Sequence, residues 1–400
     1  MCMSKYSRFL FSASLIVAIG FPPLQAQLLE EIIVTARKRD ESLQDTPASV
    51  QAFTAGMIDS IGISSMRDYA NLIPNFFLVE TQASAFTFVN IRGVTQFRNT
   101  DPSVAIVVDG VLSTSPVSMS QELFDVQQIE VLKGPQGALY GRNSLGGAIN
   151  ITTKRPGDEV EGFVRAGVGN GSAGKVQAGI SGPLVEDSLY GRVALSYRDS
   201  DGVRPNRVTG NNADAAENFS GRARLIWEAS DTFEADLRLS FDDDTTRALQ
   251  FIDTAPIFHE VAPGGPSLGV AVGAFPAFHP FGATAVRGGP TASALFVPGQ
   301  AANVGNFDIE PETVGTQGNL DGIDERSVYN ISLQLNWDLD IGTLTSTTSW
   351  DKIDEIATGE QPIRTADRTQ VNTQWRFSEA ISQELRLTSP DDQPLRWIAG

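Results

Sequence analysis

The residues best able to do chemistry in this sequence are few and far apart. Only two histidines are present, His259 and His279. A zinc site needs three or four convergent ligands, so this pair is a weak candidate. The run from Asp242 to Asp244 lacks the glycine and closing glutamate of an EF-hand loop, and we expect a solvated strand end there. No metal site is predicted.

The sequence supports nucleophilic catalysis and nucleotide binding no better than it supports a metal site. The single cysteine is Cys2, and no G-x-S-x-G motif occurs. A phosphate loop would need lysine directly after Gly146, where the sequence has Gly147. Residues 169–174 fit G-x-G-x-x-G, but residues 175–180 continue as an alternating strand and not as the helix that a dinucleotide site requires. We therefore predict no enzyme activity, no catalytic residue and no cofactor.

The N-terminus has the pattern of a secretory signal peptide. Lys5 and Arg8 precede an apolar run over residues 9–21, and Ala26 offers a small residue for cleavage. Removal of residues 1–26 would take away Cys2 and two positive charges, so the formal net charge of −18 becomes −20. Such acidity argues against nucleic-acid binding. After the expected signal peptide the sequence has no run of 18 apolar residues, so no transmembrane helix is predicted.

Residues 158–400 alternate between apolar and polar side chains with the period of a β-strand. Between residues 233 and 242, phenylalanine, alanine and leucine share one face, while Glu234, Asp236, Arg238, Ser240 and Asp242 share the other. Short connections alternate with long ones, as in outer-membrane barrels with short periplasmic turns. A soluble β-sandwich is the alternative, but it rarely tolerates an insertion as long as residues 244–325.

About eight strands and the start of a ninth are predicted in this region. An open sheet edge is not viable in the hydrocarbon of a membrane, because every backbone donor and acceptor must be paired there. We therefore expect the sequence to be the N-terminal part of a longer barrel.

Residues 45–156 predict a compact α+β domain. Ser65 and Asp68 have the spacing of a helix capping box. Met66, Tyr69 and Ile73 then fall on one helical face, as does Ala70, before Pro74 ends the helix.

Three stretches of this domain, and one segment that precedes it, resemble TonB-dependent outer-membrane receptors. Residues 27–44 contain a segment similar to the TonB box, formed by Glu31, Ile32, Ile33, Val34, Thr35 and Ala36. Residues 91–93 and 108–111 match parts of the family's plug domain, and residues 129–151, IEVLKGPQGALYGRNSLGGAINI, match it most strongly. The motif positions are Gly93, Asp109, Gly110, Glu130, Gly134, Gly137, Tyr140, Gly141, Gly146, Gly147 and Asn150.

The resemblance implies a fold, a place and a partner. It implies an α+β plug followed by antiparallel transmembrane β-barrel strands, here an incomplete 22-stranded barrel, in the bacterial outer membrane with plug and TonB box facing the periplasm. The partner would be TonB, energised by the inner-membrane proton gradient. A β-branched segment such as residues 32–35 suits pairing with the edge of a partner's sheet.

The resemblance also implies a function and a plug lock. The function would be active uptake of a scarce bulky ligand, most often a ferric siderophore, with cobalamin, oligosaccharides and aromatic compounds as alternatives and a passive porin as a different class. Arg92 and Arg142 match plug arginines that bind barrel glutamates, and Glu384 is a candidate partner. Independently, we expect Arg192, Arg198, Arg222, Arg224 and Arg238 to face the barrel lumen.

Overall fold

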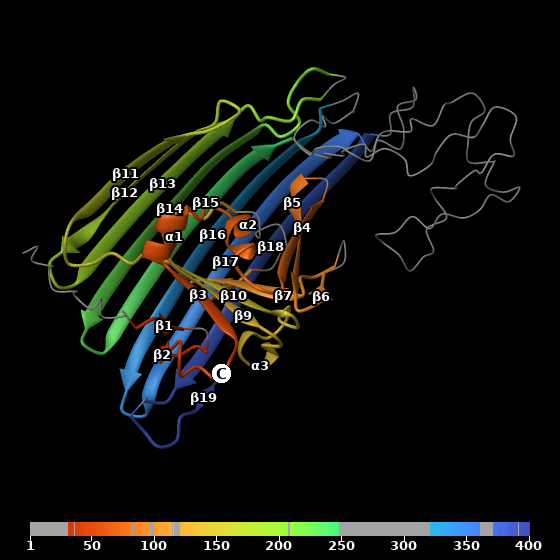
Figure 1. Ribbon diagram of the computed structural model, residues 1–400. Helices are drawn as coiled ribbons and strands as arrows, with labels where there is room; N and C mark the ends of the chain where they lie inside the picture. The colour runs from red at the N-terminus through yellow and green to blue at the C-terminus, as the bar shows by residue number, and fades with distance from the viewer. Residues whose placement is uncertain are drawn as a thin grey trace, which may run out of the picture.

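The computed structural model describes residues 31–35, 37–81, 83–96, 100–113, 115, 121–206, 209–247, 321–360, 371–390 and 392–400. The expected signal peptide, Ala36 and both histidines lie outside these residues. A small α+β domain lies against one face of a large antiparallel sheet (Figure 1). Among the described residues, no helix is both long enough and apolar enough to cross a membrane.

The small domain is built on a five-stranded sheet with the strand order β3-β9-β10-β7-β8. Strand β10 pairs in parallel with β7 and antiparallel with β9. Both faces are covered. Ile129 and Ile149 pack on the side of two helices, whereas Leu132 and Ala148 pack on the side of Tyr140. The bounds are β3 (Val50–Thr54), β7 (Val104–Val108), β8 (Val111–Leu112), β9 (Val126–Lys133), β10 (Gly147–Thr153), α1 (Ala55–Ile61), α2 (Met66–Ala70) and α3 (Gly137–Tyr140).

Two smaller sheets accompany it. One pairs β1 (Ile33–Val34) with β2 (Glu41–Ser42), and the other joins β4 (Phe76–Thr81), β5 (Ala83–Ile91) and β6 (Val94–Thr95).

The predicted capping box is confirmed at the start of α2. The Asp68 carboxylate accepts hydrogen bonds from the backbone N–H groups of Ser64 and Ser65, both at 2.8 Å. Met66 and Tyr69 are buried on the face that the spacing predicts, as are Ala70 and Ile73. The cap therefore fixes how α2 enters the core.

Two motif glycines are required by the backbone. Asp109 and Gly110 form the two-residue turn between β7 and β8, with φ angles of 49° and 85°, as a tight hairpin turn requires. At Gly147 a Cβ atom would lie 2.2 Å from the Leu132 carbonyl oxygen, so only glycine lets β10 approach β9 this closely.

The large sheet contains nine described strands, each paired antiparallel with the next along the chain. This confirms the predicted fold class of a plug followed by antiparallel barrel strands. The strands are β11 (Glu161–Val168), β12 (Gly174–Val185), β13 (Leu189–Ser200), β14 (Ala216–Ser230), β15 (Phe233–Thr246), β16 (Ile323–Leu339), β17 (Gly342–Glu360), β18 (Val371–Thr388) and β19 (Ile398–Ala399).

The two faces of this sheet differ as the alternation predicts. Asp236 and Arg238 on β15 are 0% and 8% exposed on the face toward the small domain, whereas Leu239 is 42% exposed on the other face. On that outer face Phe233 packs against Trp337, with ring centroids 4.7 Å apart. The strands thus turn a polar face toward the small domain and an apolar face outward, as contact with lipid requires. We name the sheet of β11–β19 the wall.

We predict that Asp68→Ala loosens α2. Loss of a capping interaction costs about 1 kcal/mol, so backbone amides of residues 66–70 should exchange with deuterium several-fold faster. Hydrogen exchange followed by mass spectrometry checks this in the intact protein. Asp45→Ala, an exposed carboxylate outside any helix, is the control and should leave these amides unchanged. Equal exchange in both variants would show that the cap contributes nothing.

Candidate functional site

The segment that resembles a TonB box is a short strand at the edge of the small domain. In β1, Ile33 pairs with Ser42 and Val34 pairs with Glu41 of β2. Val34 is 1% exposed, whereas Ile33 is 45% exposed. The backbone of the segment is therefore already paired within the chain, and one side chain anchors it.

Three side chains of the central sheet hold this strand. The Glu130 carboxylate oxygen Oε1 accepts a hydrogen bond from the Thr35 backbone N–H at 2.8 Å. The amide of Gln128 donates to the Ile33 carbonyl at 2.8 Å, and the amide of Asn150 donates to the Thr35 hydroxyl at 3.1 Å. We name Gln128, Glu130 and Asn150 the clasp.

Glu130 is the centre of the clasp. It is 1% exposed, and both its oxygens are bonded, since Gln128 donates to Oε1 at 3.0 Å and Asn150 donates to Oε2 at 3.2 Å. Burial raises the pKa of Glu130, and the hydrogen bonds from Thr35 and Asn150 oppose that rise. Its carboxylate is thus held by Thr35 of the docked segment together with Gln128 and Asn150 of the central sheet.

The residues after β1 reach the large sheet. Lys38 Nζ lies 3.5 Å from Glu384 Oε2 on β18 and 5.4 Å from the centre of the Tyr140 ring. The Arg39 guanidinium donates to the Ser389 hydroxyl at 2.8 Å and to the Trp397 carbonyl at 2.6 Å. Burial lowers the pKa of Lys38, and Glu384 counteracts this. The segment is therefore tied to both the small domain and the wall.

This placement corrects the expected partner of the plug arginines. Glu384 contacts Lys38 and Arg386 (2.7 Å to Arg386 Nη1), and not Arg92 or Arg142. Among the described residues, neither of those two arginines forms an ion pair. Arg92 sits in the turn between β5 and β6 with φ 52°, and Arg142 is exposed after α3. Their locking role stays a prediction.

A bidentate ion pair joins the small domain to the wall with the charges placed the other way round from the expected lock of plug arginines and barrel glutamates. Arg192 on β13 binds both carboxylate oxygens of Asp125, with Nε 2.8 Å from Oδ2 and Nη2 bonded to Oδ1. Its third nitrogen donates to the Ser181 hydroxyl at 2.9 Å. Both partners are buried, and a bidentate pair of this kind is strong and directional. Here the wall supplies the arginine and the plug the carboxylate.

Two more arginines of the wall donate to backbone carbonyl groups of the small domain. Arg224 is held by Asp236 at 2.7 Å and donates to the Thr153 carbonyl at 3.1 Å. Arg238 is held by the same Asp236 at 2.5 Å and donates to the Asp109 carbonyl at 2.6 Å. Asp109 in turn accepts from the Thr153 hydroxyl at 2.6 Å. The β7–β8 turn is thereby fixed to β14 and β15, and the expected inward position of these arginines is confirmed.

The small domain also forms side-chain bonds with the strands that begin the wall, β11 to β13. Glu122 lies 2.7 Å from Lys175 Nζ and accepts from the Ser196 hydroxyl at 3.0 Å. On the outermost strand, Arg165 pairs with Asp59 of α1 at 2.7 Å. Each strand from β11 to β15 thus bonds the small domain.

The expectation of a solvated strand end at Asp242 to Asp244 is wrong. Asp242 and Asp244 are both 6% exposed and lie 3.6 Å and 3.2 Å from Arg326 on the neighbouring strand. Arg326 comes from beyond the long connection, so the pair depends on strand register. Among the described residues no group of acidic or histidine side chains could hold a metal ion.

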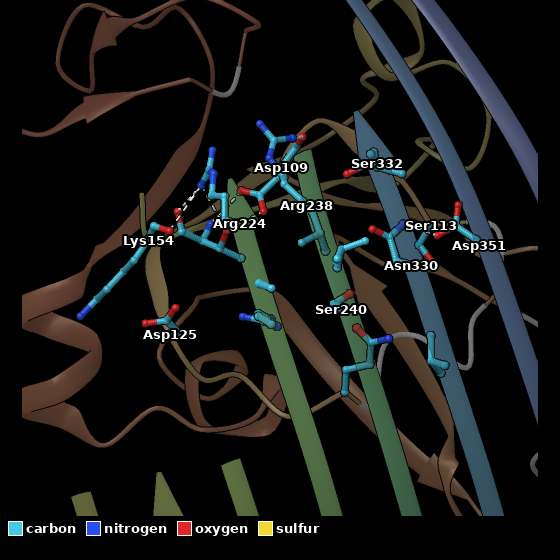
Figure 2. A pocket seen from close by; sticks show the side chains of 18 of the residues that line it. Asp109, Ser113, Asp125, Lys154, Arg224, Arg238, Ser240, Asn330, Ser332 and Asp351 are labelled. Carbon is cyan, nitrogen blue, oxygen red and sulfur yellow. Dashed lines mark hydrogen bonds between the residues drawn. The ribbon is translucent and has the colours of Figure 1, made fainter. Parts of the chain in front are cut away.

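A cavity of about 80 Å³ lies where these contacts end (Figure 2). One side is the β7–β8 hairpin with Asp109, and the other is the wall with Arg238, Asn330 and Ser332. A polar cavity of this size holds several water molecules. Further lining residues are Ser113, Asp125, Thr153, Lys154, Arg192, Arg224, Ser240 and Asp351.

The remaining motif positions shape the backbone around these contacts. Tyr140 is buried, which raises the pKa of its hydroxyl, and it packs with Leu132. The N–H of Gly146 donates to the Ser103 carbonyl at 2.8 Å. Positive φ angles occur at Gly93, Gly134 and Gly141, and Gly137 begins α3.

Sequence reasoning missed Asp125 and Gln128. Neither belongs to a motif that the resemblance identifies, and both act across long sequence separations. The signal that pointed to Asp125 was indirect, since Arg192 was expected to face the lumen and a buried guanidinium needs a carboxylate.

Comparisons with known proteins agree with this geometry. A model of the TonB-dependent receptor plug domain matches residues 42–148. The pesticin receptor of Yersinia pestis is 30% identical over 214 residues, which are 52% of this chain and 31% of that protein. The vitamin B12 transporter of Vibrio vulnificus is 27% identical over 216 residues, 52% of this chain and 34% of that protein.

Solved structures share the fold over most of the described chain. The ferric yersiniabactin uptake receptor of Yersinia pestis superposes with a TM-score of 0.65 at 20% identity, covering 86% of this chain and 46% of that one. The ferripyoverdine receptor of the outer membrane of Pseudomonas aeruginosa gives 0.65 at 17% identity, covering 90% and 42%. The chain thus spans about a third to a half of the length of these proteins. Residues 42–148 are thus a plug domain of TonB-dependent receptors, and the described chain shares the fold of a plug beside an antiparallel barrel wall with the solved receptors.

Proposed function

We propose that this chain is the plug and part of the barrel of a transporter that imports a scarce, bulky ligand across the outer membrane, driven by TonB. The observation that carries the proposal is the docked strand β1, whose backbone is held by side chains of the plug's central sheet. A partner that binds this strand could transmit force to the central sheet of the plug. A passive porin would not need such a segment.

In this mechanism TonB binds residues Glu31 to Ala36 by adding them to its own sheet. Strand addition uses main-chain hydrogen bonds, so it competes with the pairing of β1 to β2 and with the clasp. Force on the segment then reaches β9 and β10 through Glu130 and Asn150. The plug shifts, and the ligand passes.

A ferric siderophore is the ligand class that we propose. Support comes from the relatives, several of which are named as siderophore, ferripyoverdine or ferric yersiniabactin receptors. The vitamin B12 transporters among them keep cobalamin as the second candidate. The phenylalanine-rich connection expected to touch a ligand lies outside the described residues.

Replacing residues 31–36 by a Gly-Ser sequence of equal length in the full-length parent should abolish uptake and leave ligand binding intact. The strand-forming side chains would be lost, whereas the ligand side of the plug would not change. Uptake of radioactive ferric siderophores by iron-starved cells checks this, with Ile33→Val as the conservative control. Undiminished uptake would refute TonB-driven transport.

Glu130→Gln should release the docked strand more often. The amide keeps one acceptor oxygen but loses the charge, and a hydrogen bond to a charged group contributes about 1.5–3 kcal/mol. We expect the Thr35 amide to exchange with deuterium roughly tenfold faster or more. Glu161→Gln, at an exposed site on β11, is the matched control. Unchanged exchange at Thr35 would mean that Glu130 does not hold the strand.

Asp125→Ala should weaken the seating of the plug. The change leaves Arg192 buried without its partner, which costs about 3–5 kcal/mol. The plug should become several-fold more sensitive to added protease in reconstituted full-length protein. Removing both charges with the additional change Arg192→Ala should restore part of the resistance, whereas Asp45→Ala at an exposed site should have no effect. A double variant as weak as the single one would argue against the pairing.

A further inference from the structure

Among the described residues, the bonds between the plug domain (residues 45–156) and the wall all lie on β11–β15. Every strand from β11 to β15 forms a hydrogen bond or ion pair with the plug, through side chains that include Arg165, Lys175, Arg192, Arg224 and Arg238. We name β11–β15 the anchored flank.

The next two strands behave differently. Within the described chain, side chains from Val328 to Asn336 on β16 and from Thr343 to Ile353 on β17 hydrogen-bond only with other wall residues. Asn330 donates to Asp351 at 2.7 Å, and Gln334 donates to Asn336 at 3.2 Å. We name these two stretches the free flank.

The free flank is nonetheless covered. Ser332 and Ser349 are each 2% exposed, and Val328 and Ile353 are also buried. The cavity reaches this part of the wall, because Asn330, Ser332 and Asp351 line it, but it also extends along the anchored flank, where Arg192, Arg224 and Arg238 line it. On the free flank the plug thus faces the wall across space for water and without a hydrogen bond between described side chains, whereas on the anchored flank bonds bridge the same space.

The cost of separation differs between the flanks. Parting the plug from β13–β15 must break buried, charge-assisted bonds such as Arg192–Asp125. Parting it from the free flank breaks no bond between the described side chains of that flank and the plug, and it enlarges a cavity that already exists. Separation of the plug from the wall therefore costs more free energy along the anchored flank than along the free flank.

The force enters next to the free flank. The segment that follows β1 is bonded to β18 through Lys38 and to the β18–β19 turn through Arg39. Strand β18 is the neighbour of β17 in the sheet. A pull on the segment therefore acts beside the two strands, β16 and β17, whose described side chains form no bond with the plug along the free flank.

We propose that the plug separates from the wall first along β16 and β17, and that the lumen opens to a passing ligand on this side while the anchored flank keeps its bonds. The route rests on the proposed transport function. On the free flank the cavity is lined by Asn330, Ser332 and Asp351 beside two apolar side chains, and these polar groups suit a ligand with hydrogen-bonding atoms.

Single cysteines test the order of separation. The only cysteine of the sequence is Cys2, so Ser332→Cys and Ser349→Cys report on the free flank against no background in the described chain. Ser220→Cys on β14 and Ala194→Cys on β13 are matched reporters of the anchored flank, since both side chains are 1% exposed. The probe is a water-soluble maleimide, applied to the full-length protein in lipid vesicles at increasing urea.

At intermediate urea, the two free-flank cysteines should react at least about tenfold faster than the two anchored-flank cysteines, because only the latter are protected by buried charge pairs. Equal rates at all four sites, or faster reaction at Ser220→Cys, would overturn the proposal. The readout needs neither TonB nor ligand, so it stands apart from the uptake experiment.

Conductance tests the route itself. With the protein in a planar bilayer, urea that loosens the plug should open an ion current, and a maleimide attached at Ser332→Cys should reduce it at least severalfold. The same label at Ser220→Cys should leave the current unchanged. A block at Ser220→Cys alone, or at both sites equally, would place the opening elsewhere.

Discussion

The buried pair of Arg192 and Asp125 sets the relation between plug and wall. Two charges removed from water are stable only together, and a bidentate geometry permits one arrangement. Arg224 and Arg238 follow the same rule with Asp236, and their remaining N–H groups bind carbonyls of the plug. The plug thus binds to the polar inner face of the strands, and the position of the plug depends on the register of β13–β15.

Local features of this fold could be predicted from sequence because they depend on neighbouring residues. The capping box needs only Ser65 and Asp68, and strand faces need only a period of two. Which inward residues meet could not be predicted. Asp125 meets Arg192 across 67 positions, and Thr35 meets Glu130 across 95. These contacts depend on sheet register and on where the plug sits.

The two incorrect expectations have the same origin. Asp242 and Asp244 looked solvated because their partner Arg326 lies on the far side of a long connection. Glu384 was expected to meet a plug arginine, but Lys38 occupies that position because the N-terminal segment runs beside β18. In both cases a buried or half-buried carboxylate found a cation, as low dielectric demands, and only the identity of the cation was unpredictable.

Strand β9 connects the two functional contacts of the plug. Glu130, which holds the docked strand, lies within β9, and Asp125, which holds the wall, directly precedes it. Asp125 lies just before the first residue of β9 and Glu130 lies near its middle, so five residues of extended chain, roughly 17 Å, separate the two contacts. Because β9 is paired on both sides, by β3 and β10, it cannot lengthen without breaking the sheet. Tension at Thr35 therefore reaches Asp125 through a stiff element. For the same reason Arg192 opposes that tension directly, and the weaker contacts on β16 and β17 yield before it does.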